Sequence, residues 1–209
     1  MRIATRTFML ALAVLALVPA RVEAKRLAKS QPLKTGQTTS YGAAGATTAG
    51  VSPMYNDLGN GVIKDQRTGL FWEKKSDDGS IHDWDNDYSW STGSPWNFDG
   101  TAASVFLTTL NAEPCFAGFC DWRQPTLNEL ETIRDLGNVN PAVPAVFNTS
   151  CAAGCTVTTC SCTSSGYYWA SSTYQSSPGY AWSVSFDDGY ASADNKTNGG
   201  YVRAVHGGS

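Results

Sequence analysis

The residues of this sequence most able to do chemistry are its six cysteines. Cys115 and Cys120 lie five positions apart in CFAGFCDWRQPTLNEL, and four more lie close together in CAAGCTVTTCSC. In a cytosolic enzyme such thiols would suggest a metal or redox site, whereas in an exported protein they close into disulfides. The spacing of the second group matches neither a zinc ribbon nor a zinc finger. The compartment of the protein therefore decides between these two kinds of chemistry.

The first residues of the chain indicate export. Two arginines precede an apolar run from Phe8 to Val18, and Val22 and Ala24 occupy the small-residue positions of a signal-peptidase site. The run is shorter than the roughly 20 apolar residues that span a membrane. We therefore expect residues 1–24 to be a cleaved signal peptide and the mature chain not to insert into a membrane. The expected location is secreted or at the cell surface, with the periplasm as the alternative.

Export predicts that no cysteine keeps a free thiol. We expect the first two cysteines to bridge each other. The other four allow nested pairing, Cys151 with Cys162 and Cys155 with Cys160, or crossed pairing, because Cys160 and Cys162 are too close to favour each other. A bridge over so short a loop contributes on the order of 2 kcal/mol, so we expect these disulfides to hold the shape of loops.

A second group that could do chemistry is acidic. The stretch HDWDNDYSW places Asp83, Asp85 and Asp87 at alternate positions, in a segment from Ser76 to Thr101 with six aspartates and no lysine or arginine. A calcium ion could neutralise these carboxylates. The stretch is not an EF-hand, because the required glycine and closing glutamate are missing. The sequence favours a structural calcium site or a solvated acidic loop, and no other cofactor.

Residues suited to acid–base catalysis are few. His82 and His206 are the two histidines, and His206 lies next to a Gly-Gly-Ser tail. His82 lies beside the acidic stretch, so a Ser-His-Asp arrangement would need a mobile terminus as its base. We therefore expect a protein that is not an enzyme.

Charge and composition divide the mature chain into two parts. Residues 25–54 are mostly Gly, Ala, Thr, Ser and Gln with four basic side chains, which predicts a flexible linker. Residues 55–209 carry 17 acidic and 8 basic side chains, a net of nine negative charges. This charge argues against nucleic acid and against polyanionic partners in general, because like charges repel at long range. A stretch of this length is expected to form one domain with a sizeable core.

The early part of this domain shows a hairpin and two helices. The runs 62–65 and 70–74 flank a turn-rich Gln-Arg-Thr-Gly, which predicts a hairpin. A first helix is expected from a cap at Asp99 or Thr101 to about Asn111. Apolar side chains three to four residues apart would form its buried face: Ala103, Phe106, Leu107 and Leu110.

A capping box marks the second helix. Thr126 is followed three residues later by Glu129, and apolar residues at 127, 130 and 133 share one face. We expect this helix to end near Gly137.

The last third of the chain shows strand signals. The runs 167–171, AWSVSF and the closing YVRAV alternate apolar and polar residues. We expect Trp169, Trp182, Val184 and Phe186 to form the buried face of an antiparallel sheet. Helices early and antiparallel strands late predict an α+β fold.

The remaining residues of this region are rich in tyrosine and small polar types, the composition of antibody combining sites. We expect them to form a ligand-binding face, with ordinary loop and edge residues as the alternative. The candidates are Tyr174, Gln175, Ser176, Tyr180, Tyr190, Ser192, Asp194, Asn195, Asn198 and Tyr201.

The stretch Asp121-Trp122-Arg123 connects the two predicted helices. We expect Trp122 to fill the core, while Asp121 and Arg123 point to the other side and pair with neighbouring groups. The expected role of all three is structural. The alternative is that Arg123 binds a carboxylate or sulfate of a ligand.

Three separated motifs resemble one known family. GNGVIKDQRTGLFWEKK, FAGFCDWRQPTLNELETI, and YYWASSTY with AWSVSFDDG and YVRAV are similar to the Lcl C-terminal domain, the module that closes collagen-like adhesins of Legionella. The resemblance implies a C-type-lectin-like fold related to sulfatase-modifying, formylglycine-generating domains, with two helices, small antiparallel sheets and long disulfide-pinned loops. It also implies surface adhesion, with sulfated glycosaminoglycans as the family's ligands, and assembly as a homotrimer.

Together these observations predict an exported bacterial binding or adhesion module that recognises a glycan or a protein ligand. The alternatives are an oxidase of the sulfatase-modifying type and a surface receptor with a diversified C-terminal face.

Overall fold

The computed structural model describes residues 32–45 and 47–208. The predicted signal peptide and the first part of the predicted linker lie outside the described residues. In the described part of the linker, Leu33 forms a β-bridge with Val51, and the assignment of this segment as a linker stays a prediction. Within the part of the chain that the structure describes, no helix has the length and apolar character needed to cross a membrane.

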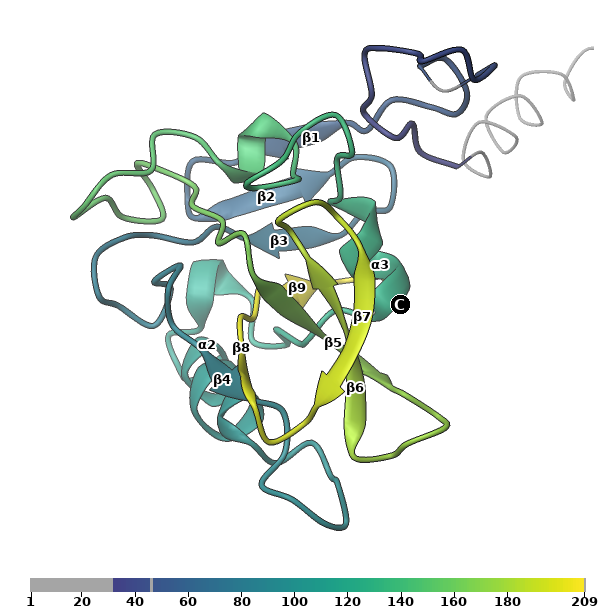
Figure 1. Ribbon diagram of the computed structural model, residues 1–209. Coiled ribbons are helices and arrows are strands. Elements are labelled where there is room, and N and C mark those ends of the chain that lie inside the picture. The colour runs from purple at the N-terminus through teal and green to yellow at the C-terminus, as the bar shows by residue number, and fades with distance from the viewer. Residues whose placement is uncertain (1–31, 46, 209) are drawn as a thin grey trace, which may run out of the picture. The chain divides into compact units, whose positions relative to one another are not determined.

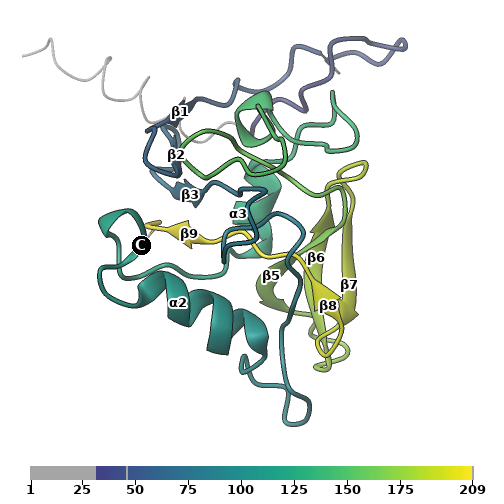
Figure 2. The ribbon, with the colours of Figure 1, turned by 90° about the vertical axis from the view of Figure 1, so that its left-hand side faces the viewer.

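A four-stranded antiparallel sheet joins the beginning of the domain to its end. Its strands follow the order β1 (Tyr55–Asp57), β2 (Val62–Asp65), β3 (Phe71–Glu73) and β9 (Val205–His206). The predicted hairpin is confirmed as β2 and β3, and β9 pairs with the outer edge of β3 (Figure 2). Asp65 closes the hairpin turn, because its carboxylate accepts hydrogen bonds from the N–H of Arg67 and the hydroxyl of Thr68.

The first predicted helix is present, but it begins and packs differently. It consists of the π-helix η1 (Ala102–Leu107) continued by α2 (Thr108–Asn111). The predicted caps bond elsewhere, because Asp99 accepts from the N–H of Thr92 and Thr101 accepts from the N–H of Ser89. The helix buries the side chains of Ala102, Phe106, Leu107 and Leu110, so Ala102 takes the place expected for Ala103.

The second predicted helix is α3 (Leu127–Thr132), and its capping box is confirmed. Thr126 Oγ1 accepts from the N–H of Glu129 at 3.3 Å, and a Glu129 carboxylate oxygen accepts from the N–H of Thr126 at 2.8 Å. The helix is shorter than expected. It ends before Gly137 because Ile133 already leaves the helical conformation.

Most of the last third forms the three-stranded antiparallel sheet β5 (Tyr167–Thr173), β6 (Tyr180–Ser185) and β7 (Ala191–Asn195), drawn in green to yellow in Figure 1. A separate short ladder pairs β4 (Tyr88–Ser89) with β8 (Gly199–Gly200). Two short 3₁₀ turns complete the elements, η2 (Phe116–Gly118) and η3 (Ala145–Phe147). The few helices and the small antiparallel sheets confirm the predicted α+β class.

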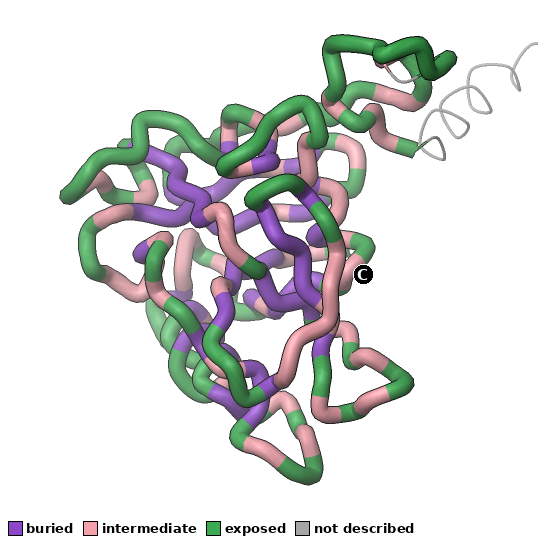
Figure 3. Tube along the Cα trace, viewed as in Figure 1, coloured by how far each residue is buried: buried purple, intermediate pink, exposed green. Residues whose placement is uncertain are grey.

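Both faces of this three-stranded sheet are buried, so the expectation of a single buried face is wrong. Trp169 lies opposite Ser183 and Tyr168 lies opposite Val184, which places Trp169 and Val184 on different faces. Trp169 packs into the core beside η1, whereas Val184 packs against the residues of α3. Even Ser183 is fully buried. Figure 3 shows the buried segments gathered between the sheets, with the exposed segments in the surrounding loops.

Candidate functional site

The hairpin of β5 and β6 carries an aromatic hollow on its surface. The hollow has a volume of about 450 Å³ and is lined by Tyr174, Ser177, Tyr180, Trp182 and Ala193. The rings of Tyr174 and Trp182 meet edge to face, with centroids 5.3 Å apart. The Tyr180 residue is 40% exposed. The hollow therefore presents aromatic surface to solvent, which is the surface that ligands of amphipathic character prefer.

Backbone hydrogen bonds fix the turn of the hairpin that carries Tyr174 and Tyr180. The N–H of Tyr174 donates to the carbonyl of Tyr180 at 2.9 Å, and the N–H of Tyr180 donates to the carbonyl of Ser177 at 2.8 Å. Trp182 lies opposite Ala193 on β7, where the methyl group leaves the indole accessible. Trp182 is thus half-buried and lines the hollow, whereas the sequence placed it in the core.

A buried lysine holds the loops beside the hollow. Lys196 is 2% exposed, and its Nζ lies 3.8 Å from the Trp90 ring centroid. The same atom donates to the carbonyl of Trp96 at 3.2 Å and to Thr173 Oγ1 at 2.9 Å. Burial lowers the pKa of Lys196. Gly179, in the hairpin turn, packs directly against the Trp96 ring, so Trp96 contacts the turn that precedes Tyr180.

Two other tyrosines of the predicted binding face lie outside the hollow. Tyr190 contacts Tyr167 at the far end of β6, where the two hydroxyls share a hydrogen bond and the ring centroids are 5.9 Å apart. This hydrogen bond raises the pKa of Tyr190 to about 12. Tyr201 is half-buried, with its ring centroid 5.5 Å from that of Tyr168.

The polar members of the predicted face are divided between the two sides of the sheet. Ser192 and Asp194 lie on the side of Ala181, whereas Asn195 lies beside Tyr180 on the side of the hollow. Exposed positions in turns are occupied by Gln175, Ser176 and Asn198. Of the predicted set, the structure brings only Tyr174 and Tyr180 together in the hollow.

The three alternate aspartates do not all meet, although the carboxyl groups of Asp83 and Asp85 are in contact. Asp83 is buried and accepts from the N–H groups of Gly79 and Asp85. Burial opposes ionisation of Asp83, but the hydrogen bonds it accepts lower its pKa on balance. The protonated Asp85 carboxyl can donate to the Asp83 carboxylate, and this bond raises the pKa of Asp85. Asp87 is exposed and lies against Gly199. Among the described residues these three carboxylates do not form one group of metal ligands, and calcium binding stays a prediction.

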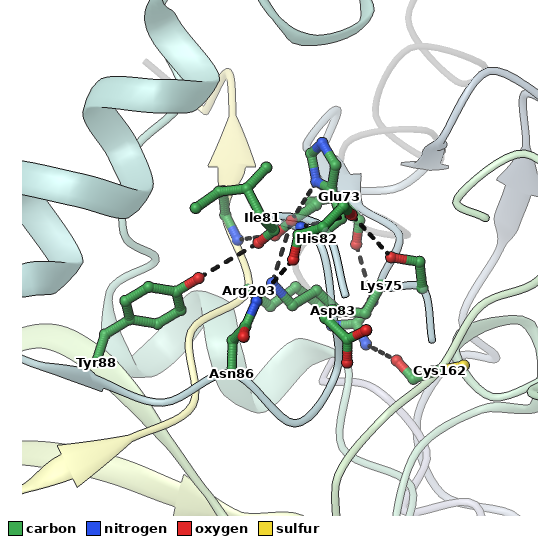
Figure 4. Close-up of polar contacts among 12 residues, drawn as sticks. Glu73, Lys75, Ile81, His82, Asp83, Asn86, Tyr88, Cys162 and Arg203 are labelled. Carbon is green, nitrogen blue, oxygen red and sulfur yellow. Dashed lines mark hydrogen bonds and ion pairs between the residues drawn. The ribbon is translucent and has the colours of Figure 1, made fainter. Parts of the chain in front are cut away.

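A buried network of charges was not predicted from the sequence (Figure 4). Glu73 Oε1 lies 2.7 Å from His82 Nδ1 and 3.2 Å from Lys75 Nζ, and Glu73 Oε2 accepts from the N–H of Ala204 at 3.0 Å. Burial alone would raise the pKa of Glu73, but Lys75 and the hydrogen bond from His82 lower it on balance. Burial also disfavours the charged form of Lys75, which lowers its pKa, and the Glu73 carboxylate opposes that shift.

Arg203 extends this network to the cysteine-rich loop. Its guanidinium is fully buried and donates to the backbone carbonyl of Glu73 at 2.8 Å and to that of Cys162 at 2.6 Å. A third bond reaches Thr163 Oγ1 at 2.8 Å. Burial lowers the pKa of Arg203. The network therefore connects β3 and the final strand region to the disulfide-bonded segment.

The segment Asp121-Trp122-Arg123 pairs with groups from several elements. Trp122 is 2% exposed and donates from Nε1 to the carbonyl of Phe116 at 2.9 Å. Asp121 lies on the surface, 2.6 Å from His206 Nδ1. Arg123 forms two parallel bonds to the Glu129 carboxylate, at 2.8 and 2.6 Å. These contacts agree with a structural role for the segment between η1–α2 and α3, which stays a prediction.

One family model matches the sequence over residues 61–206, and its description is the Lcl C-terminal domain. The match runs from the start of β2 to the end of β9 and covers more than half of the chain. This chain belongs to the Lcl C-terminal domain family. No curated protein and no solved structure matches the chain. The aromatic hollow and the buried charge network both lie inside the Lcl C-terminal domain.

All six cysteines of this Lcl C-terminal domain are paired. Of the two arrangements that the sequence left open, the structure has the nested one. The disulfides are Cys115–Cys120, Cys151–Cys162 and Cys155–Cys160. They hold loops in place, because each of them closes a segment that contains no strand.

Proposed function

We propose that this protein is an exported binding or adhesion module that recognises a glycan or a protein ligand through the aromatic hollow of a C-type-lectin-like domain. The observation that carries the proposal is the hollow itself, in which Tyr174, Tyr180 and Trp182 present accessible aromatic surface on a rigid hairpin. Aromatic rings of this kind bind with little loss of side-chain entropy. Sugar rings and apolar protein side chains both fit such a surface.

The uncharged lining of the hollow favours an uncharged ligand. Its lining contains no lysine, arginine or carboxylate among the described residues. The domain as a whole is acidic, so long-range attraction would not draw a sulfated polyanion to it. We therefore propose neutral glycans or protein surfaces as ligands in preference to the sulfated glycosaminoglycans that the family resemblance implied.

The state of the cysteines supports a binding role over an oxidase of the sulfatase-modifying type. Such an oxidase needs a pair of reduced cysteines, whereas all six cysteines here are in disulfides. The disulfides agree with a secreted or cell-surface location.

The test compares binding of the wild-type domain with that of two hollow variants, on a glycan array and on host cell surfaces. Tyr174→Ala and Tyr180→Ala should each weaken binding about 5- to 30-fold, because each removes about 1 to 2 kcal/mol of aromatic contact. The melting temperature should stay close to that of the wild type. The matched control is Tyr190→Ala, an equally exposed tyrosine at the far end of β6, which should bind like the wild type.

Two results would contradict the proposal. If Tyr174→Ala and Tyr180→Ala both bound with wild-type affinity, the hollow would not be the binding site. If only Tyr190→Ala lost binding, the site would lie at the far end of β6. Binding of the domain to the glycan array would identify a glycan ligand, whereas binding to host cells alone would indicate a protein ligand. The proposed homotrimer is tested separately, by light scattering of the purified domain.

A further inference from the structure

A second hollow lies where the segment before α3 meets the end of the chain that the structure describes. Its volume is about 540 Å³, and it shares no lining residue with the aromatic hollow. Apolar and polar residues from five separate segments contribute to its wall. They include Phe98, Leu107, Gln124, Thr126, Ser171 and Gly207.

Gln124 is the unusual member of this wall. The residue is 3% exposed, and neither its amide nitrogen nor its amide oxygen has a hydrogen-bond partner among the described residues. Burying an amide without partners is costly, so buried amides are nearly always paired. The amide torsion of a glutamine is soft, so its oxygen and nitrogen can exchange places at little cost, and a shift of the side chain into the hollow would let both atoms reach a ligand. Gln124 therefore offers one acceptor and two donor hydrogens beside a space large enough for a ligand.

The charged side chains of the same wall already have partners. Arg123 donates to both oxygens of Glu129, and its second terminal nitrogen also donates to the carbonyl of Gly207 at 2.7 Å. The Glu129 carboxylate accepts in addition from the N–H of Thr126. The two opposite charges thus satisfy each other, and the hollow has no free charge for an ionic ligand. This arrangement does not support the alternative in which Arg123 binds a carboxylate or sulfate.

We propose that this second hollow binds the acetamido group of an uncharged N-acetylated sugar, with Gln124 as the residue that recognises it. An acetamido group presents one N–H and one carbonyl, which match the oxygen and nitrogen of the Gln124 amide. Its methyl group fits the apolar part of the wall at Phe98 and Leu107. The hydroxyl of Ser171, an exposed residue, is placed at the rim to bond the sugar ring. This site is independent of the aromatic hollow.

The test follows the side-chain amide signal of Gln124 in ¹⁵N-labelled protein by NMR while N-acetylglucosamine is added. The signal is assigned by its absence from Gln124→Leu. We expect saturable shifts of this signal and of the backbone signals of Ser171 and Gly207. Glucose, which lacks the acetamido group, should cause none of these shifts.

Variants separate recognition from folding. Gln124→Leu replaces the unpaired amide by an apolar group of similar size, so it should fold with a melting temperature no lower than that of the wild type. It should lose the backbone shifts at Ser171 and Gly207. Gln66→Leu is the matched control, because Gln66 is an exposed glutamine in the β2–β3 turn, and it should keep the full response.

Three outcomes would overturn the proposal. The first is no saturable shift with N-acetylglucosamine up to about 50 mM, a concentration at which binding weaker than millimolar is still detected. The others are equal shifts with glucose and an unchanged response in Gln124→Leu. Tyr174→Ala should leave the response intact. Failure of the aromatic hollow to bind its own ligand would therefore not be confused with failure at this site.

Discussion

Glu73 is the residue on which the buried charges of this domain depend. It is fully buried, and it is the carboxylate that faces Lys75 and His82. We predict that Glu73→Gln lowers the free energy of unfolding by about 3 to 5 kcal/mol, because Lys75 would stay buried without the carboxylate that it contacts. Denaturant unfolding followed by tryptophan fluorescence measures this loss. Glu131→Gln is the matched control.

The control removes a carboxylate of a different kind. Glu131 and Arg134 form a partly exposed pair at 3.5 Å, so its loss should cost less than about 1 kcal/mol. If Glu73→Gln were no more destabilising than Glu131→Gln, the buried network would not contribute to stability as described.

Glu129 gives the domain a defined dependence on pH. Burial opposes ionisation of this carboxyl, but the bonds from Arg123 and Thr126 lower its pKa on balance. A lowered pKa stabilises the fold above the ordinary glutamate pKa of about 4.3, and this contribution is lost as the pH falls through the folded-state value. Glu129→Gln keeps the capping geometry but removes the charge.

We therefore predict that Glu129→Gln is less stable than the wild type by about 1 kcal/mol at pH 7, a value reduced for the partial exposure of Arg123. Urea unfolding at several pH values should show this difference shrinking below about pH 4. An equal difference at pH 3 and pH 7 would mean that the ion pair is not its cause.

Sequence analysis found the residues whose partners are close along the chain and missed those whose partners are far away. Thr126 and Glu129 are three positions apart, so their capping box follows from local geometry. Glu73 and Arg203 are 130 positions apart, and no periodic pattern marks such a pair. The unpaired amide of Gln124 is equally invisible, because burial depends on segments that meet only in the folded domain.

At the scale of elements, the close packing of β8 on β5 is open to test. A methyl group on Gly200 would lie 2.6 Å from Trp169 Nε1 and 2.9 Å from the adjoining ring carbon. We predict that Gly200→Ala lowers the free energy of unfolding by about 1 to 3 kcal/mol, because the buried indole must shift. Thermal unfolding measured by circular dichroism checks this loss.

Gly179→Ala is the comparison for this prediction. Its new methyl would meet the Trp96 ring at 3.3 Å, a tight contact that a small movement of the loop relieves. A larger effect at Gly179 than at Gly200 would contradict the packing of β8 described here.

Strand prediction succeeded where residues alternate and failed where neighbours override the alternation. The hairpin β2–β3 and the strands β5 and β6 follow from their patterns. The strand β7 has the sequence ASADN, which has little strand propensity, and it forms because β6 offers it an edge. The serines of β6 read as a solvent face, yet Ser183 is covered by segments that the sequence could not place. Nothing in the local pattern reveals that a sheet is covered on both sides.

For the whole molecule, the disulfide arrangement makes a prediction about the native protein. A thiol reagent should label no cysteine even after denaturation without a reductant, because all six are paired. Fragmentation mass spectrometry of the unreduced cysteine-rich peptide should give the nested links, Cys151–Cys162 and Cys155–Cys160. A crossed link would show that the loop has a different shape, and reactive thiols would favour the oxidase alternative.

The family and the α+β class of the whole domain were predictable because the three motifs occur in sequence order and the elements have their own local signals. The aromatic hollow was predictable only in part. Tyr174 and Tyr180 were expected at the binding face, but Trp182 was assigned to the core because strand alternation cannot tell a fully covered position from one at the margin of a sheet.

The pairing of β9 with β3 affects how the protein can be made. Val205 lies opposite Trp72, and Arg203 bonds the carbonyl of Glu73, so the first sheet and the buried charges are complete only when residues near position 205 are present. During synthesis the ribosome releases these residues after all the other elements. We therefore expect a nascent chain to complete this sheet only after β9 has left the ribosome. Messages cut short before this point would yield polypeptides that proteases can remove.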